Sequence, residues 1–190
     1  MSKTTNILIA GVGGQGTLLA SKLMGKVFTE QGYDVKVSEV HGMSQRGGSV
    51  VTYVKYGDKV YSPIIDRGEA DLILAFEMLE AMRALPYLKK GGKMIANTQK
   101  MNPMPVITGA MEYPENIEEK LSAKINLQAV DALSLAEKAG TIKAVNVVLI
   151  GLLAKSMDVD KNVWIDVIKE TVPEKFLDVN IKAFELGYEL

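Results

Sequence analysis

The fold is decided by residues 6–16, which read NILIAGVGGQG. Residues 6–10 form a short apolar run followed directly by glycines, a pattern typical of a strand that is buried on both faces of a sheet. From Gly16 the apolar residues instead repeat every four positions, as on one face of a helix, until Gly32 supplies a stop. The stretch therefore predicts a strand, a glycine turn and a helix, in that order.

The composition is that of a globular chain without a charge bias. Its 190 residues predict a single domain, residues 1–190. The 22 Lys and Arg residues nearly cancel the 23 Asp and Glu residues, so no basic field exists to attract nucleic acid or a membrane surface. The sequence contains no cysteine, which excludes disulfides and thiolate ligands for zinc or iron–sulfur clusters. We therefore expect no nucleic-acid partner and no metal site, and any redox metal must belong to a partner.

Two apolar stretches bear on where the chain resides. The first residues contain about five apolar side chains in a row, fewer than the ~7 to 15 of a signal-peptide core. The most apolar stretch, residues 144–154, is shorter than the ~20 residues that a membrane span needs. We expect a cytoplasmic protein in which residues 144–154 form a buried helix.

The chain alternates strand and helix patterns, with one exception. A second strand over residues 35–40 completes a βαβ unit. Only the eight residues 41–48 separate it from the next strand pattern, residues 49–56, whereas a parallel crossover needs about a dozen or more. We therefore predict that residues 49–56 turn tightly and return over residues 59–62 as an inserted β-hairpin.

The parallel pattern then resumes and ends in helices. Further strands are expected over residues 72–76, 93–97 and 125–130, and helices over residues 78–87, 115–123, 133–139, 144–156, 162–172 and 176–188. The predicted fold class is α/β: a Rossmann-like, mostly parallel sheet flanked by helices, with the β-hairpin inserted after the second strand and a helical C-terminal part.

Residues 11–16 match the pattern G-x-G-x-x-G. Such a loop brings backbone N–H groups and a helix N-terminus against a diphosphate. We interpret these residues as a candidate cofactor-binding loop: Gly11, Gly13, Gly14, Gln15 and Gly16. A close-packed structural turn is the alternative, and whether the loop binds a nucleotide, coenzyme A or nothing stays open.

Glu39 lies 23 residues after Gly16, near the ~20 expected for the acid that binds the ribose in NAD enzymes. A stand-alone NAD(P) or flavin oxidoreductase is therefore one hypothesis. Against it, the eight-residue connection interrupts the βαβαβ half that a dinucleotide fold needs, and Glu39 can equally be a solvated charge.

Residues 41–48 read HGMSQRGG and contain the only histidine of the chain. Glycines let a backbone approach a partner closely, an arginine can fork onto phosphate or carboxylate, and a histidine can titrate near neutrality. His41 is thus a candidate for proton transfer in catalysis, and a second group is predicted to bind a cofactor: Ser44, Gln45, Arg46, Gly47 and Gly48. The alternative is a structured turn with a surface histidine.

In an open α/β sheet, ligands bind beyond the carboxyl ends of the strands. Glu77 and Asn97 stand at two of these ends, although roles as caps would explain them equally well. Asn146 interrupts the most apolar helix pattern, and we expect its amide to tie down a loop rather than touch a ligand.

Together with the glycine loop and HGMSQRGG, two further stretches carry a family resemblance: ADLILAFEMLEAMRALPYLKKGGKMIANT at residues 70–98 and KAVNVVLIGLLAKSM at residues 143–157. Over about residues 6–186 the chain resembles the gamma domain of 2-oxoacid:ferredoxin oxidoreductases. Within that family the likeness is closest to the small (beta) subunit of the members that act on indolepyruvate.

The resemblance implies a subunit that is not active alone. The family couples thiamine-diphosphate decarboxylation of a 2-oxoacid to ferredoxin reduction, with coenzyme A taking the acyl group. This chain lacks the cysteines and the family's Gly-Asp-Gly and Asn-Asn signature for thiamine diphosphate and magnesium. The resemblance therefore assigns thiamine diphosphate, Mg and the Fe–S clusters to a large alpha subunit, with coenzyme A and ferredoxin as partners of the complex. Pyruvate, 2-oxoisovalerate or 2-oxoglutarate remain alternative substrates. Besides this subunit and the stand-alone NAD(P) or flavin enzyme, a nucleotide-sensing binding module is a third functional hypothesis.

Overall fold

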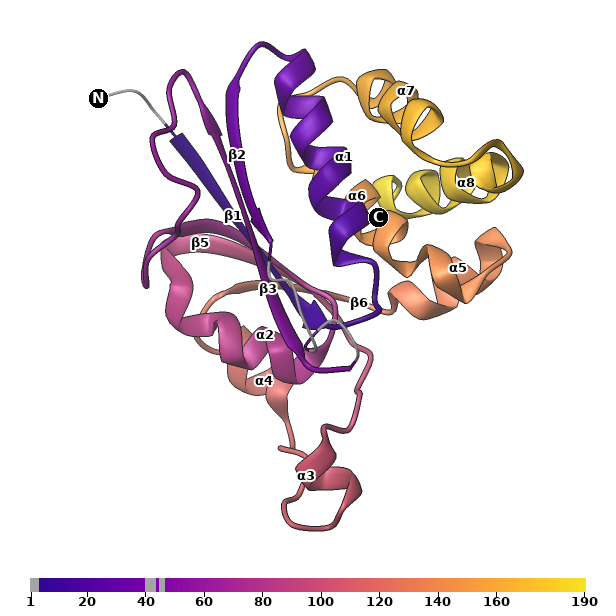
Figure 1. Cartoon of the computed structure of the whole chain (residues 1–190). Helices are drawn as coiled ribbons and strands as arrows, with labels where there is room; N and C mark the ends of the chain where they lie inside the picture. The colour runs from indigo at the N-terminus through magenta and orange to yellow at the C-terminus, as the bar shows by residue number, and fades with distance from the viewer. Residues whose placement is uncertain (1–3, 40–43, 45–46) are drawn as a thin grey trace.

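The chain folds around a six-stranded sheet. The computed structural model describes residues 4–39, 44 and 47–190, and in it the strands lie in the order β2-β3-β1-β4-β5-β6 (Figure 1). The strands are β1 (Thr4–Val12), β2 (Asp34–Glu39), β3 (Ser49–Gly57), β4 (Ala70–Ala75), β5 (Leu88–Asn97) and β6 (Asn126–Val130). β1, β4, β5 and β6 are parallel to one another. The predicted fold class, a mostly parallel α/β sheet with a helical C-terminal part, is confirmed.

The strand after β2 differs from the prediction in its partner. We expected residues 49–56 to form a hairpin with residues 59–62, but residues 59–62 form no strand. β3 instead lies between β2 and β1 and pairs antiparallel with both, from Thr4 opposite Gly57 to Val12 opposite Ser49 along β1. Because both edges of β3 are hydrogen-bonded in this way, a return strand has no free edge of β3 to pair with. The short connection thus correctly predicts that the chain reverses direction after β2, but the reversed strand, β3, pairs with β1 of the central sheet.

β1 is buried on both faces, as its apolar run predicts. Ile7 and Ile9 belong to one core, and Leu8 and Ala10 belong to the core on the opposite face. Figure 1 shows α1 and α5 to α8 on one side of the sheet, and α2 and α4 on the other. The helices are α1 (Thr17–Glu30), α2 (Met78–Ala84), α3 (Met104–Ile107), α4 (Ile117–Ser122), α5 (Ala132–Ala139), α6 (Val145–Lys155), α7 (Lys161–Thr171) and α8 (Leu177–Tyr188), with short 3-10 turns at η2 (Leu85–Tyr87), η3 (Ile142–Ala144) and η4 (Glu174–Phe176).

Two local details depart from the sequence pattern. β5 begins at Leu88 rather than at residue 93, because Gly91 and Gly92, a pair of residues typical of turns, lie inside the strand where its register against β4 shifts. α3 forms in a stretch for which the sequence pattern predicts no helix; Pro103 precedes the helix and Pro105 occupies its first turn, where proline is tolerated.

α6 is the most buried helix of the structure: every residue from Val145 to Ala154 is buried. The prediction of a buried helix there is confirmed. In the described part of the chain, no helix has the length and apolarity to cross a membrane.

Two glycines let α6 cross α8 at very close range. A Cβ added to Gly151 would lie 2.1 Å from the carbonyl oxygen of Phe184, and one added to Gly187 would lie 2.0 Å from that of Val148. Both obstacles are backbone atoms, which cannot rotate away. The contact therefore requires glycine on both helices.

We expect Gly151→Ala to lower the free energy of unfolding by more than about 2 kcal/mol, because the added methyl group forces the two helices apart. The measurement is urea unfolding followed by the fluorescence of Trp164, the only tryptophan, which is fully buried. Gly25→Ala in α1 is the matched control: its Cβ would meet only Val37 Cγ2, at 3.7 Å, so this variant should gain about 0.5–1 kcal/mol. Equal effects of the two substitutions would contradict the close crossing.

Candidate functional site

The glycine loop after β1 is held by a side chain of its own, Gln15. Its Oε1 accepts a hydrogen bond from the N–H of Val12 at 2.8 Å, and its Nε2 donates to the carbonyl oxygen of Phe76 at 3.1 Å. The amide thus joins the ends of two neighbouring strands, β1 and β4. Gly11 is buried within β1, where a Cβ would come within 3.1 Å of Gln15 Oε1, Phe76 and Thr17. Gln15 therefore holds the loop by hydrogen bonds, and Gly11 leaves the space that the Gln15 side chain occupies.

The structure joins the glycine loop to the end of the second predicted loop. The N–H of Gly13 donates to the carbonyl oxygen of Gly48 at 2.8 Å, and the N–H of Gly47 donates to that of Gly13 at 3.2 Å. The N–H of Gly48 in turn donates to the carbonyl oxygen of Ser44 at 3.0 Å. The candidate residues Gly13, Ser44, Gly47 and Gly48 therefore lie together. His41, Gln45 and Arg46 lie outside the described residues.

Gly16 ends the loop and begins α1 against another helix. Its φ is +84°, and a Cβ there would lie 2.5 Å from Nδ2 of Asn146. That Nδ2 donates to the carbonyl oxygen of Gly16 at 3.3 Å, while Oδ1 of Asn146 accepts from the N–H of Val147 at 3.0 Å. The prediction that Asn146 ties down a loop is confirmed.

A groove of about 480 Å³ opens beside the glycine loop. Residues of the loop form one wall, and the ends of β5, α5 and α6 form the others: Gly13, Gly14, Gln15, Gly16, Gln99, Met101, Leu133, Ile142, Lys143 and Val145. Gly14 is exposed, has a φ of +101°, and has open space where a Cβ would be. Among the described residues, the groove thus combines exposed loop backbone with the cation Lys143, a combination that suits an anionic ligand.

The sequence reasoning missed Gln99 and Lys143. Gln99 follows β5 by two residues, so the rule that ligands bind beyond strand ends could have found it. Lys143 lies in η3, just before the buried helix α6. The sequence identifies this position only as the start of an apolar helix, which does not indicate a binding role.

Glu39 does not occupy the position that a ribose-binding acid needs. It pairs with Thr52 of β3, which pairs with Ile9 of β1. Glu39 is therefore level with Ile9, three residues before the end of β1, and two strand spacings or about 10 Å to the side. Its Oε1 accepts a hydrogen bond from Ser21 of α1 at 2.5 Å. The inserted strand β3 thus removes the dinucleotide geometry, and Glu39 serves to join β2 to α1.

Two buried carboxylates organise the other loops at this edge. Glu77, only 1% exposed, caps α2 through the N–H of Glu80 at 2.9 Å and also accepts from the N–H of Met101 at 3.0 Å and the hydroxyl of Tyr113 at 2.5 Å. Burial and the neighbouring Glu77 raise the pKa of Tyr113, so its hydroxyl keeps the proton that it donates. Glu80 accepts from the hydroxyl of Ser49, at the start of β3, at 2.5 Å. The capping interpretation of Glu77 is confirmed.

Asn97 is fully buried at the end of β5. Its Nδ2 donates to Phe76 at 3.2 Å and its Oδ1 accepts from the N–H of Ala132 at 3.2 Å. The side chain thus joins the end of β4 to the start of α5 through hydrogen bonds within the protein.

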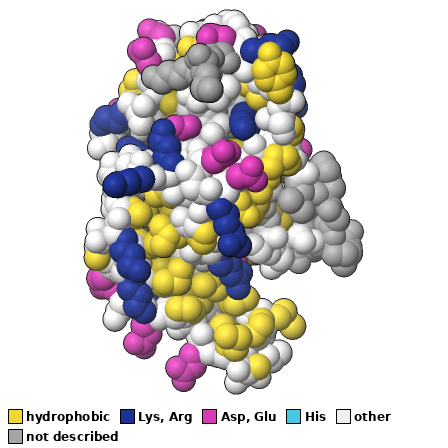
Figure 2. Space-filling model, turned by 90° about the vertical axis from the view of Figure 1, so that its left-hand side faces the viewer, with side chains coloured by type: hydrophobic (Ala, Val, Ile, Leu, Met, Phe, Trp, Pro, Cys, Tyr) yellow, Lys and Arg dark blue, Asp and Glu magenta, His cyan; other side chains and the backbone are white. Residues whose placement is uncertain are grey.

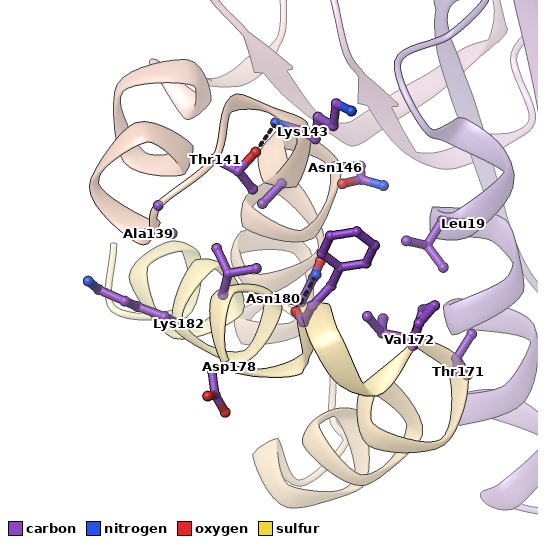
Figure 3. A pocket seen from close by; sticks show the side chains of 15 residues that line it. Leu19, Ala139, Thr141, Lys143, Asn146, Thr171, Val172, Asp178, Asn180 and Lys182 are labelled. Carbon is purple, nitrogen blue, oxygen red and sulfur yellow. Dashed lines mark hydrogen bonds between the residues drawn. The ribbon is translucent and has the colours of Figure 1, made fainter.

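A larger cavity, of about 620 Å³, lies between α1 and the C-terminal helices (Figure 3). Its inner wall is apolar, with Leu19, Val172 and Phe176 among the lining residues. Figure 3 shows the charged ends of Asp178 and Lys182 pointing away from that wall. Lys143 lines this cavity as well as the groove, but only the groove contains the exposed backbone of the glycine loop, and we therefore take the groove as the candidate functional site. In the described ranges, no three His, Asp or Glu side chains are grouped to hold a metal ion.

Comparisons with known proteins agree over the whole chain. The sequence profile of a family described as pyruvate ferredoxin/flavodoxin oxidoreductase matches residues 6–190. A relative in Thermococcus kodakarensis, the indolepyruvate oxidoreductase subunit IorB, is 45% identical, and the alignment covers 97% of this chain and 95% of that one.

Two solved structures share the fold. The pyruvate oxidoreductase subunit PORC from Thermotoga maritima has a TM-score of 0.77 at 20% identity, covering 98% of this chain and 96% of that one. A 2-oxoglutarate:ferredoxin oxidoreductase from Magnetococcus marinus, with coenzyme A and succinyl-CoA bound, has a TM-score of 0.76 at 18% identity. It covers 100% of this chain, which matches 31% of that longer one. The fold therefore occurs both as a separate chain and as part of a longer chain.

The contact between Gly16 and Asn146 predicts unequal effects of one substitution at two glycines. Gly14→Ala and Gly16→Ala both place a side chain at positive φ, which costs about 1–2 kcal/mol. Gly16→Ala must in addition displace Asn146, which its two hydrogen bonds hold in place, so it should cost about 1–3 kcal/mol more in urea unfolding.

The background variant Asn146→Ala removes the obstacle. In that background Gly14→Ala and Gly16→Ala should cost the same. A difference that persists without Asn146 would show that the packing explanation is wrong.

Proposed function

This chain belongs to the pyruvate ferredoxin/flavodoxin oxidoreductase family, and we propose that it is the small subunit of an indolepyruvate:ferredoxin oxidoreductase. The observation that carries the proposal is the 45% identity, over nearly the full length of both chains, to a subunit named for indolepyruvate. The reaction of the complex is the oxidative decarboxylation of an arylpyruvate, with transfer of the acyl group to coenzyme A and of the electrons to ferredoxin.

The redox cofactors belong to a larger partner subunit in this proposal. Iron–sulfur clusters are held by cysteine thiolates, and this sequence has none. It also lacks the Gly-Asp-Gly and Asn-Asn signature for thiamine diphosphate and magnesium. These residues do not fit those cofactors, so the contribution of this chain is to bind and position.

We assign to the groove beside the glycine loop the phosphates of coenzyme A. α1 begins at Gly16 with no side-chain cap and no acidic residue in its first turn, so its N-terminal partial positive charge is not neutralised locally. Lys143, another lining residue of the groove, adds a full charge. The proposal includes Arg46, whose guanidinium can fork onto a phosphate, and His41 as a proton donor or acceptor in the same loop. A cytoplasmic location is part of the proposal.

The isolated chain should be catalytically silent. Anaerobic reduction of ferredoxin by indolepyruvate and coenzyme A is expected only after the large subunit is added, because this chain has no ligands for an electron-carrying cluster. Parallel assays with pyruvate, 2-oxoisovalerate and 2-oxoglutarate establish the substrate class. Turnover by the chain alone, or a reconstituted complex that prefers a small aliphatic 2-oxoacid, would contradict the proposal.

Lys143→Ala should raise the KM for coenzyme A in the reconstituted complex about fivefold at low salt, which corresponds to about 1 kcal/mol for a partly solvated charge contact. The effect should shrink as ionic strength rises. Lys138→Ala is the matched control, because it removes the same charge from an exposed position in α5 that does not line the groove. If both variants shift the KM equally, only the net charge matters and the groove is not the site.

A further inference from the structure

We infer that residues 101–113, here called the apolar lobe, insert into an apolar depression on the large subunit and form a principal contact of the complex. The inference rests on the proposed function for the identity of the partner. The lobe is the segment between β5 and α4 that contains α3.

The lobe presents apolar side chains to solvent. Met104, Ile107 and Met111 are 67%, 65% and 65% exposed. The eleven residues 101–111, MNPMPVITGAM, include no charged side chain, although 24% of the chain is charged. Figure 1 shows α3 projecting from the carboxyl edge of the sheet, clear of the helical layers. Figure 2 shows hydrophobic side chains gathered at the lower end of the molecule, which is where α3 lies in Figure 1. Exposed apolar surface of this kind marks an interaction site.

The lobe is a built structure held at both ends by one buried carboxylate. Glu77 accepts the N–H of Met101 at 3.0 Å and the hydroxyl of Tyr113 at 2.5 Å. Between these points the N–H of Met111 donates to Pro105 at 3.0 Å and that of Ile107 to Pro103 at 3.1 Å, which closes the lobe on itself. A segment ordered in advance loses less conformational entropy when it binds. The lobe thus presents its apolar side chains in a fixed arrangement.

The size and position of the lobe favour the large subunit over a second copy of this chain. A stable dimer interface contains about 20–30 residues from each partner, more than the 13 residues of the lobe supply alone. As one element of a larger interface, the lobe can provide the buried anchors that carry most of the binding energy. Met101, its first residue, also lines the groove assigned to coenzyme A, so a subunit seated on the lobe would lie next to that groove.

The test compares Ile107→Glu with Ile64→Glu. Ile64 is 49% exposed and follows β3 at the opposite, amino edge of the sheet, so the same charge is introduced far from the lobe. The affinity for the purified large subunit is measured by titration, and activity of the wild-type complex is recorded in parallel. Ile107→Glu should weaken association at least tenfold, and Met104→Glu similarly, while Ile64→Glu binds as the wild type does. Thermal unfolding of each free chain should be unchanged, because these side chains are exposed.

Three results would overturn the inference. Wild-type affinity of both lobe variants would do so while leaving the proposed function intact. Self-association of the free chain that Ile107→Glu abolishes would assign the lobe to a second copy. Failure of the wild-type chain to bind or activate the large subunit would instead overturn the proposed function, and this inference with it.

Discussion

The antiparallel pairing of β3 with β1 is the interaction on which the rest of the carboxyl edge depends. It runs from Thr4 opposite Gly57 to Val12 opposite Ser49, so β3 begins where β1 ends. The residues just before β3 are thereby brought against the residues just after β1, and Gly13 exchanges backbone hydrogen bonds with Gly47 and Gly48. Two loops that are separate in the sequence become one surface.

The same insertion explains why a dinucleotide-like loop does not make a dinucleotide site. In the dinucleotide fold, the strand that carries the ribose-binding acid lies next to the strand that precedes the glycine loop. Here β3 occupies that place, and Glu39 is bonded to Ser21 instead. The loop keeps the left-handed turn at Gly14 and the helix start at Gly16, which are the parts that an anion needs. What remains is suited to phosphate recognition without a neighbouring ribose site.

The strand, glycine turn and helix over residues 6–32 could be predicted because each depends on local apolar periodicity and on glycine. The place of β3 could not, because an alternating strand looks the same whether it pairs with a following segment or with an earlier one. The spacing between Gly16 and Glu39 suggested a ribose-binding acid for a related reason. Distance along the chain does not indicate which strand lies beside β1 in the sheet. Lys143 lines the groove because α6 packs against the glycine loop, as the hydrogen bond between Asn146 and Gly16 shows. These two residues are 130 positions apart, so the sequence alone does not indicate the contact.

Hydrogen exchange in the assembled complex, with and without coenzyme A, tests most directly the claim that the paired loops form one binding surface. Ligand contact should slow amide exchange in residues 13–16 and in residues 44, 47 and 48 together, because backbone hydrogen bonds between Gly13, Gly47 and Gly48 join the two loops. Residues 58–69, at the opposite edge, serve as the internal reference and should not change. Unaltered exchange in both loops at a coenzyme A concentration that saturates turnover would contradict the account.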